Sequence, residues 1–302
     1  MKLKINKQTL LFPIVFSIIF YSVAVWRFLA TGKVFYLWNF GYIGSALALG
    51  IFLTGALPKD QFRLVRRISQ LLIGSYLLIY VGIIRKENLQ IEGFWYYLFS
   101  GVFAGATLHY FIAKIFGPFI FNRGWCGWAC WTAMILDLFP WKRPEKEINS
   151  KWTKVRYIYF LLILILTIVV YFFMGIQKDV YEKGSIELYW LLIGNIVYYI
   201  IGFFLALTLK DNRAFCKYVC PIPVFQKVGA KYSLLKIEIN NDKCIECRKC
   251  ELNCPMQIKL LDYKNKKQRL LSTECIFCNT CTSVCQENAI GPTFKIDKRI
   301  NN

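Results

Sequence analysis

The sequence predicts an all-α polytopic membrane bundle of about six helices, followed by a smaller soluble domain of different composition. Two observations support this prediction: 56% of the 302 residues are hydrophobic, and the mean hydropathy is +0.41. A soluble domain is typically about 45–50% apolar. The apolar excess ends at about Lys210, after which the chain is polar and rich in Lys and Cys.

Six apolar stretches are long enough to cross about 30 Å of hydrocarbon at about 1.5 Å per residue. Runs such as Leu161–Phe173 have no polar face at helical spacing, which argues against a large soluble helical core. The first stretch is long and bulky and has no small-residue cleavage motif, so we expect a membrane anchor there. The expected spans are Leu10–Trp26, Phe40–Leu57, Ile68–Ile84, Phe94–Phe119, Tyr157–Ile176 and Tyr189–Leu209.

Basic residues in the connections predict the orientation, because Lys and Arg favour the cytoplasmic side. The N-terminus and alternate loops carry the more basic set: Lys2, Lys4, Lys7, Lys59, Arg63, Arg66, Arg67, Arg123, Lys142, Arg143, Lys146, Lys151, Lys154 and Arg156. The other loops carry only Arg27, Lys33, Arg85, Lys86, Lys178 and Lys183. We therefore expect a multi-pass protein of the cytoplasmic membrane with both termini in the cytoplasm.

Eight of the twelve cysteines form two copies of one motif near the C-terminus. Cys244, Cys247, Cys250 and Cys254 stand in C-x2-C-x2-C-x3-C, and the second copy consists of Cys275, Cys278, Cys281 and Cys285. Three closely spaced thiolates wrap one [4Fe–4S] cluster, while in two-cluster ferredoxins the fourth cysteine ligates the other cluster. This rule assigns Cys244, Cys247, Cys250 and Cys285 to one cluster. It assigns Cys275, Cys278, Cys281 and Cys254 to the second.

Zinc is the competing interpretation, since C-x2-C pairs also bind it. Zinc needs only two such pairs and gives no reason for the third and fourth cysteines in both copies. Disulfides are not expected in a reducing cytoplasm. The repeated motif thus predicts a C-terminal α+β domain like that of bacterial two-[4Fe–4S] ferredoxins.

The other four cysteines form a second pattern, in which Cys126 and Cys130 are spaced C-x3-C and Cys216 and Cys220 repeat that spacing. On a helix this spacing places two thiols on one face. Each pair follows the cytoplasmic end of a predicted span, so the four thiols could converge on one site. A third iron–sulfur cluster is the first interpretation; a soft metal such as Cu(I), a redox-active thiol pair or plain packing are alternatives.

Two C-x3-C motifs followed by a two-motif cysteine domain resemble the NapH-type membrane iron–sulfur proteins. The likeness runs from about Phe94 to Pro292 and rests on the twelve cysteines and on Pro221, although Trp131 stands where the family has its first proline. The resemblance implies a quinol dehydrogenase component of the kind that feeds periplasmic nitrate reductase. Related modules occur in NosR and in cytochrome oxidase accessory copper reductases.

These patterns together predict three parts of the chain. Residues 1–209 form a six-span domain with a cytoplasmic C-x3-C loop at 123–156. Residues 210–234 hold the second C-x3-C motif and a linker, and residues 235–302 form the cytoplasmic ferredoxin-like domain.

His109 is the only histidine and lies within an expected span. An ionisable residue there is a functional candidate by default, and His109 could contact a quinone head group or relay its proton. The alternative is a neutral imidazole bonded to a neighbouring helix.

The formal net charge of +20 could indicate nucleic-acid binding, but basic loops of a membrane protein explain it without that partner. No hydrolase triad or nucleotide-binding loop is evident, so no catalytic residue is assigned. The leading hypothesis is an electron-transfer subunit between a membrane quinone, or a redox partner protein, and cytoplasmic clusters. A copper-handling assembly reductase and a redox-sensing regulator are the alternatives.

Overall fold

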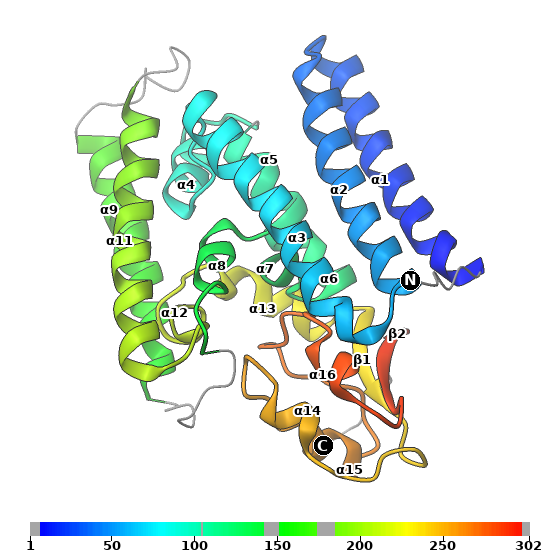
Figure 1. The fold of residues 1–302 in the computed structure, drawn as a ribbon. Coiled ribbons are helices and arrows are strands. Elements are labelled where there is room, and N and C mark those ends of the chain that lie inside the picture. The colour runs from blue at the N-terminus through cyan, green and yellow to red at the C-terminus, as the bar shows by residue number, and fades with distance from the viewer. Residues whose placement is uncertain (1–6, 104, 142–150, 174–184, 298–302) are drawn as a thin grey trace.

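A bundle of long helices stands on a small soluble domain in the computed structural model, which describes residues 7–103, 105–141, 151–173 and 185–297 (Figure 1). Five helices in this part of the chain are long and apolar enough to cross a membrane. Four of them are α1 (Lys7–Thr31), α2 (Phe35–Ala56), α9 (Val155–Phe173) and α11 (Ser185–Leu209). The fifth is one continuous helix made of η1 (Lys59–Gln61), α3 (Phe62–Ser75) and η2 (Tyr76–Ile84). The predicted membrane bundle is confirmed.

Some residues used for the orientation lie outside the described ranges, as does part of the loop predicted at 123–156. They are Lys2, Lys4, Lys142, Arg143, Lys146, Lys178 and Lys183.

The expected span Phe94–Phe119 is wrong as a single helix. The chain instead forms α4 (Ile91–Phe99) and a second helix from Gly105 to Phe121, which pack against each other. Gly101 (φ 67°) and Gly105 (φ 50°) adopt left-handed conformations between them, which glycine tolerates and which end a helix. Both halves are apolar, so hydropathy alone did not reveal the break.

The second of these helices consists of α5 (Gly105–Tyr110), the π-helical η3 (Phe111–Phe116) and α6 (Gly117–Phe121). It is shorter than the ~20 residues that a membrane-spanning helix usually needs. The segment before α4 is buried inside the bundle, with Asn88, Leu89 and Gln90 each less than 5% exposed. The chain therefore re-enters the bundle between η2 and α4.

The soluble domain is built around a two-stranded antiparallel sheet, in which β1 (Leu235–Ile239) pairs with β2 (Ile290–Phe294) and Ile237 lies opposite Pro292. Three short helices lie between the strands: α14 (Lys249–Leu252), α15 (Leu260–Asn265) and α16 (Thr280–Val284). Ile237 and Ile239 face the core of the domain. The predicted α+β ferredoxin-like fold is confirmed.

A layer of short helices separates the bundle from this domain (Figure 1). It consists of α7 (Gly124–Trp128), α8 (Trp131–Leu136), η4 (Trp152–Lys154), α12 (Ala214–Tyr218) and α13 (Pro223–Lys231). Both C-x3-C pairs lie in this layer, because α7 and α12 each carry the first cysteine of a pair. The layer thus places these thiols between the membrane helices and the ferredoxin-like domain.

Candidate iron–sulfur site

The two cysteine loops of the soluble domain share an unusual backbone conformation. Glu246 and Arg248 in the first loop, and Phe277 and Asn279 in the second, have φ between 51° and 56°. These residues occupy the same positions relative to the cysteines in both copies. Left-handed residues alternating with right-handed ones turn successive N–H groups inward, which makes the concave anion sites found around iron–sulfur centres. The loops therefore fit a bound cluster.

The same correspondence holds after the fourth cysteine of each motif. Gln257 and Asn288 are again left-handed, with φ of 53° and 52°. The N–H of Ile258 donates to Cys254 Sγ at 3.5 Å, and the N–H of Ala289 donates to Cys285 Sγ at 3.3 Å. Each fourth sulfur thus has a backbone donor, which favours a thiolate ligand.

The thiols of the second set lie near one another, as the crossed assignment requires. Cys254 interacts electrostatically with Cys278, and Cys281 interacts with Cys278, Cys275 and Cys254, and also with Cys250 of the other set. In the other set, Cys250 interacts with Cys244. The assignment of each cysteine to a cluster stays a prediction, and these contacts support it.

The two loops differ in their exposure. Cys275 is buried, and burial raises the pKa of its thiol to about 12. Cys247 is exposed and lies between Ile245 and Leu252, each 66% exposed. One centre therefore faces the bundle, and the other lies at the surface of the domain.

The four C-x3-C thiols come together in the layer between bundle and domain. Cys216 interacts electrostatically with Cys130 and Cys126, and Cys220 interacts with all three of the others. Burial raises the pKa of Cys216 to about 11 and also raises that of Cys220. Metal coordination deprotonates such thiols outright.

Among the described residues, no three His, Cys, Asp or Glu side chains are close enough to hold a single metal ion. A four-iron cluster holds its thiolates farther apart than one ion does. What Cys126, Cys130, Cys216 and Cys220 hold stays a prediction, with a third cluster as the first interpretation.

An internal repeat surrounds these cysteines, and our sequence reasoning missed it. Asn122-Arg123 precedes Cys126 as Asn212-Arg213 precedes Cys216, so N-R-x2-C-x3-C occurs twice. Arg123 and Arg213 are 0% and 1% exposed. The matching letters were visible in the sequence, and comparing the contexts of the two C-x3-C motifs would have found them.

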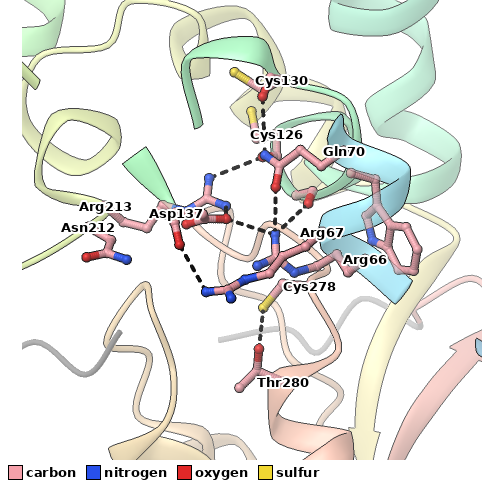
Figure 2. A network of polar contacts seen from close by, with 12 residues as sticks. Arg66, Arg67, Gln70, Cys126, Cys130, Asp137, Asn212, Arg213, Cys278 and Thr280 are labelled. Carbon is pink, nitrogen blue, oxygen red and sulfur yellow. Dashed lines mark hydrogen bonds and ion pairs between the residues drawn. The ribbon is translucent and has the colours of Figure 1, made fainter. Parts of the chain in front are cut away.

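Arg213 lies in a buried network that also contains Arg66 and Asp137 (Figure 2). Its guanidinium donates to Asp137 Oδ2 at 2.5 Å and to the carbonyl of Cys126 at 3.2 Å. Arg66 donates to the same carboxylate oxygen at 3.0 Å and to the Gly127 carbonyl at 2.9 Å. Although burial alone would raise it, the two guanidinium groups hold the pKa of Asp137 below its usual range. The network fixes the backbone of the first C-x3-C loop.

Two further hydrogen bonds fix the first C-x3-C loop. The Gln70 amide donates to the Cys130 carbonyl at 3.2 Å. The Trp128 indole donates to the Phe277 carbonyl in the second ferredoxin loop at 2.9 Å. The C-x3-C loop is therefore attached directly to the loop of the buried ferredoxin centre.

Glu274, next to Cys275, is the main ionic contact between the domain and the helices. It pairs with Arg123 at 2.6 Å, Arg156 at 3.0 Å and Lys227 at 2.6 Å. Burial opposes ionisation, but these cations lower the pKa of the Glu274 carboxyl to about 2. A second contact is made by Lys217, which donates to Asp211 at 2.7 Å and to Gln257 at 3.0 Å.

Buried positive charge exceeds buried negative charge around the C-x3-C thiols. Six cations in the described part of the layer and adjoining helices are each less than 9% exposed, and only three carboxylates pair with them. The cations are Arg66, Lys114, Arg123, Arg156, Arg213 and Lys217, and the carboxylates are Asp137, Asp211 and Glu274. Buried charge without compensation is costly, so this surplus favours an anionic group at the thiols.

Several polar atoms here are buried without a hydrogen-bond partner. They include Nε and Nη2 of Arg123 and Nε of Arg213. Donors of this kind in a native site require an acceptor. The sulfur atoms of an anionic cluster would supply one.

A cavity that is partly open lies in the bundle next to the first C-x3-C loop. Its walls are largely apolar and aromatic and include Phe40 and Trp125, with His109, Asn39 and Glu87 as polar groups. The His109 ring lies 5.2 Å from the ring of Trp125, centroid to centroid, and its Nε2 atom is buried without a partner. The π-helices η2 and η3 both line the cavity, and such wide turns are frequent at functional sites.

Gly127 lies so close to the ferredoxin-like domain that one added methyl group should weaken the docking of this domain. A Cβ there would lie 2.3 Å from the Ile276 carbonyl oxygen, so Gly127→Ala should destabilise the docked domain by about 1–3 kcal/mol. Limited proteolysis at the ferredoxin domain should become faster. In Gly291→Ala the added Cβ would meet no atom within 4 Å, and this control should behave like the parent; equal proteolysis of both variants would contradict the docking geometry.

Comparison with known families identifies the class of protein. Residues 236–286 match a 4Fe–4S dicluster domain, and residues 103–147 and 196–240 each match a 4Fe–4S binding domain. The latter two matches contain the two C-x3-C pairs. The fold and these sites together define a ferredoxin-type electron-transport protein of the membrane, with two [4Fe–4S] clusters as cofactors.

Three relatives show what the chain is similar to. The chain is 29% identical to the uncharacterized protein MJ0749 of Methanocaldococcus jannaschii, over 77% of this chain and 87% of the relative. It is 24% identical to the putative electron transport protein YccM of Escherichia coli, over 64% of this chain and 57% of that one. With the ferredoxin-type protein NapH of the same organism the identity is 25%, over 58% and 63% of the two chains. The predicted NapH-type resemblance is thus confirmed. No solved structure matches the chain.

Proposed function

We propose that this protein transfers electrons between a membrane quinone and a redox partner protein on the cytoplasmic side. A third cluster, held by Cys126, Cys130, Cys216 and Cys220, would lie between the quinone cavity and the ferredoxin domain. The observation that carries the proposal is the surplus of buried cations around these four thiols, next to an apolar cavity lined by His109. Iron–sulfur clusters accept and donate single electrons.

The quinone end of this route is the cavity that contains His109. Small-molecule sites are mostly apolar with a few placed polar groups, and the aromatic walls together with His109 and Asn39 meet this description. Trp125 lines the cavity and directly precedes Cys126 in the chain. A quinone bound there would lie beside the first C-x3-C loop.

The partner end of the route is the exposed loop around Cys247. Ile245 and Leu252 are exposed apolar side chains on either side of it, and apolar surface rimmed by polar residues is typical of docking sites. Lys243, Arg248 and Lys249 are exposed beside them. We infer that the partner presents an apolar patch with acidic residues around it.

The proposal includes the orientation of the protein in the membrane and the division of the chain into domains. The ferredoxin-like domain and both termini would face the cytoplasm, as the basic residues indicate. The parts would be the six-span domain 1–209, the C-x3-C segment 210–234 and the cluster domain 235–302.

A test of the quinone end compares His109→Phe with the parent protein. Loss of a positioned acid–base group should slow cluster reduction by a water-soluble hydroquinone about 10²-fold. Iron content and reduction by dithionite should be unchanged. Tyr21→Phe, which alters an exposed tyrosine that bonds the Ser45 hydroxyl outside the cavity, serves as control. If the parent protein is not reduced by any hydroquinone, the proposed function is wrong; if His109→Phe reacts like the parent, His109 has no part in it.

A further inference from the structure

A second, smaller cavity lies at the end of the bundle opposite the ferredoxin-like domain. Its lining includes Glu187 in the first turn of α11, and Glu92 and Asn88 from the re-entrant segment. One oxygen of Glu92, Oε2, is buried and has no hydrogen-bond partner. In Figure 1 the first turn of α11 stands at the far end of the molecule from β1 and β2.

Tyr97 is hydrogen-bonded to the Glu187 carboxylate that lines this cavity. Its hydroxyl donates to Glu187 Oε2 at 2.8 Å, and the N–H of Asn88 donates to the same oxygen at 3.4 Å. Tyr97 and Glu187 are 8% and 6% exposed. Such a bond between a buried phenol and a buried carboxylate is a route along which a proton can pass.

Glu87 also interacts electrostatically with Tyr97, and it lines the larger cavity together with His109. Gly105 shows how close the two side chains are. A Cβ built on this glycine would be 3.3 Å from Glu87 Oε2 and 3.2 Å from Tyr97 Cε1. The carboxylate and the phenol ring therefore both border the space that Gly105 leaves without a side chain.

Other charged and titratable groups of the described structure lie around Glu87. Arg85 lies 3.7 Å from its carboxylate, Tyr76 of η2 interacts with it electrostatically, and His109 of α5 shares its cavity. Acidic side chains inside a membrane bundle are expensive and mark proton relays or substrate pathways. Three of them, Glu87, Glu92 and Glu187, occur together here.

We propose that Glu87, Tyr97 and Glu187 form a proton relay from the larger cavity to the face of the bundle opposite the ferredoxin domain. The inference rests on the proposed function. A hydroquinone that is oxidised breaks two O–H bonds and loses two protons and two electrons; the electrons go singly to the iron–sulfur centres, and the protons pass through Glu87, Tyr97 and Glu187. Reduction of the quinone takes protons up along the same groups. Electron transfer would then move protons across the membrane.

The test uses the whole protein in vesicles with a pH-sensitive dye trapped in the lumen. A short-chain hydroquinone is the donor, and membrane-impermeant ferricyanide outside accepts electrons only from chains whose ferredoxin domain faces outward. The lumen then borders the opposite face. We expect lumen acidification of about one proton per electron, whereas protons that appear only outside would overturn the relay. Empty vesicles correct for direct oxidation of the donor.

Two variants locate the path. Tyr97→Phe and Glu187→Gln should each reduce lumen acidification at least about tenfold, while iron content and dithionite reduction stay normal. Tyr171→Phe is the matched control. The Tyr171 hydroxyl belongs to the same cavity, and in the described structure it bonds only the Phe99 carbonyl. Vesicles with this variant should show the same lumen acidification as the parent. Normal acidification in both relay variants would overturn the proposal. Failure of the hydroquinone to reduce the parent protein would instead contradict the proposed function itself.

Discussion

Replacing Cys216 with serine should remove the third centre and abolish reduction of the ferredoxin clusters by hydroquinone. Cys216 is buried and lies 4.0 Å, Sγ to Nη1, from Arg213. A serine hydroxyl does not replace a thiolate ligand, so we expect the iron content to fall by about four per chain. The measurement is iron per chain, together with the rate at which hydroquinone reduces the clusters seen by EPR.

Two controls make this result specific. Dithionite reaches the ferredoxin clusters directly and should still reduce them in Cys216→Ser. Replacing Cys220, the other cysteine of the pair, should give the same loss. A Cys216→Ser protein with unchanged iron and unchanged hydroquinone reduction would show that these thiols hold nothing that the electrons need.

Replacing Glu274 with glutamine should detach the ferredoxin domain from the helices. The change removes the shared partner of Arg123, Arg156 and Lys227 and leaves two fully buried guanidinium groups without a carboxylate. Breaking a buried pair in this way costs about 3–5 kcal/mol. Urea unfolding followed by the cluster absorbance should show a lower midpoint, and hydroquinone should reduce the clusters more slowly.

The matched control is Glu238→Gln in the same domain. Glu238 pairs with Lys295 at the surface, where the two side chains are 34% and 52% exposed. An exposed pair contributes about 0–1 kcal/mol, so this variant should unfold like the parent. Equal midpoints for the two variants would show that Glu274 does not hold the domain.

The stability of the folded protein should depend on pH through the Glu274 carboxyl. The folded protein lowers the pKa of Glu274 from 4.5 to about 2, so its contribution is fully present above the unfolded pKa. As the pH falls from about 4.5 to about 2, the carboxylate is protonated and about 3 kcal/mol of stability is lost. Urea midpoints measured over that pH range should fall for the parent protein. The midpoints of Glu274→Gln should lack this part of the fall.

Spacing in the sequence was enough to predict the cluster domain. The two C-x2-C-x2-C-x3-C motifs fix a turn around each centre because the ligands are local, and the structure repeats the same left-handed residues in both loops. Five of the six apolar runs predicted as spans are long helices in the structure. In both cases the signal lies within about 20 consecutive residues.

The remaining features depend on contacts between distant parts of the chain. The break at Gly101 and Gly105 divides a run that is apolar on both sides, so hydropathy did not reveal it. Arg123 and Arg156 were counted as loop charges that orient the chain, yet they are buried against Glu274. Sequence distances of 118 and 151 residues separate these partners, and no local pattern indicates such pairing.

The iron content of the anaerobically purified protein tests the central claim most directly. With a cluster on Cys126, Cys130, Cys216 and Cys220 besides the two in the ferredoxin domain, the account predicts about twelve irons and about twelve sulfides per chain. About eight of each, in protein whose two ferredoxin clusters are fully occupied and reduced by hydroquinone, would contradict it.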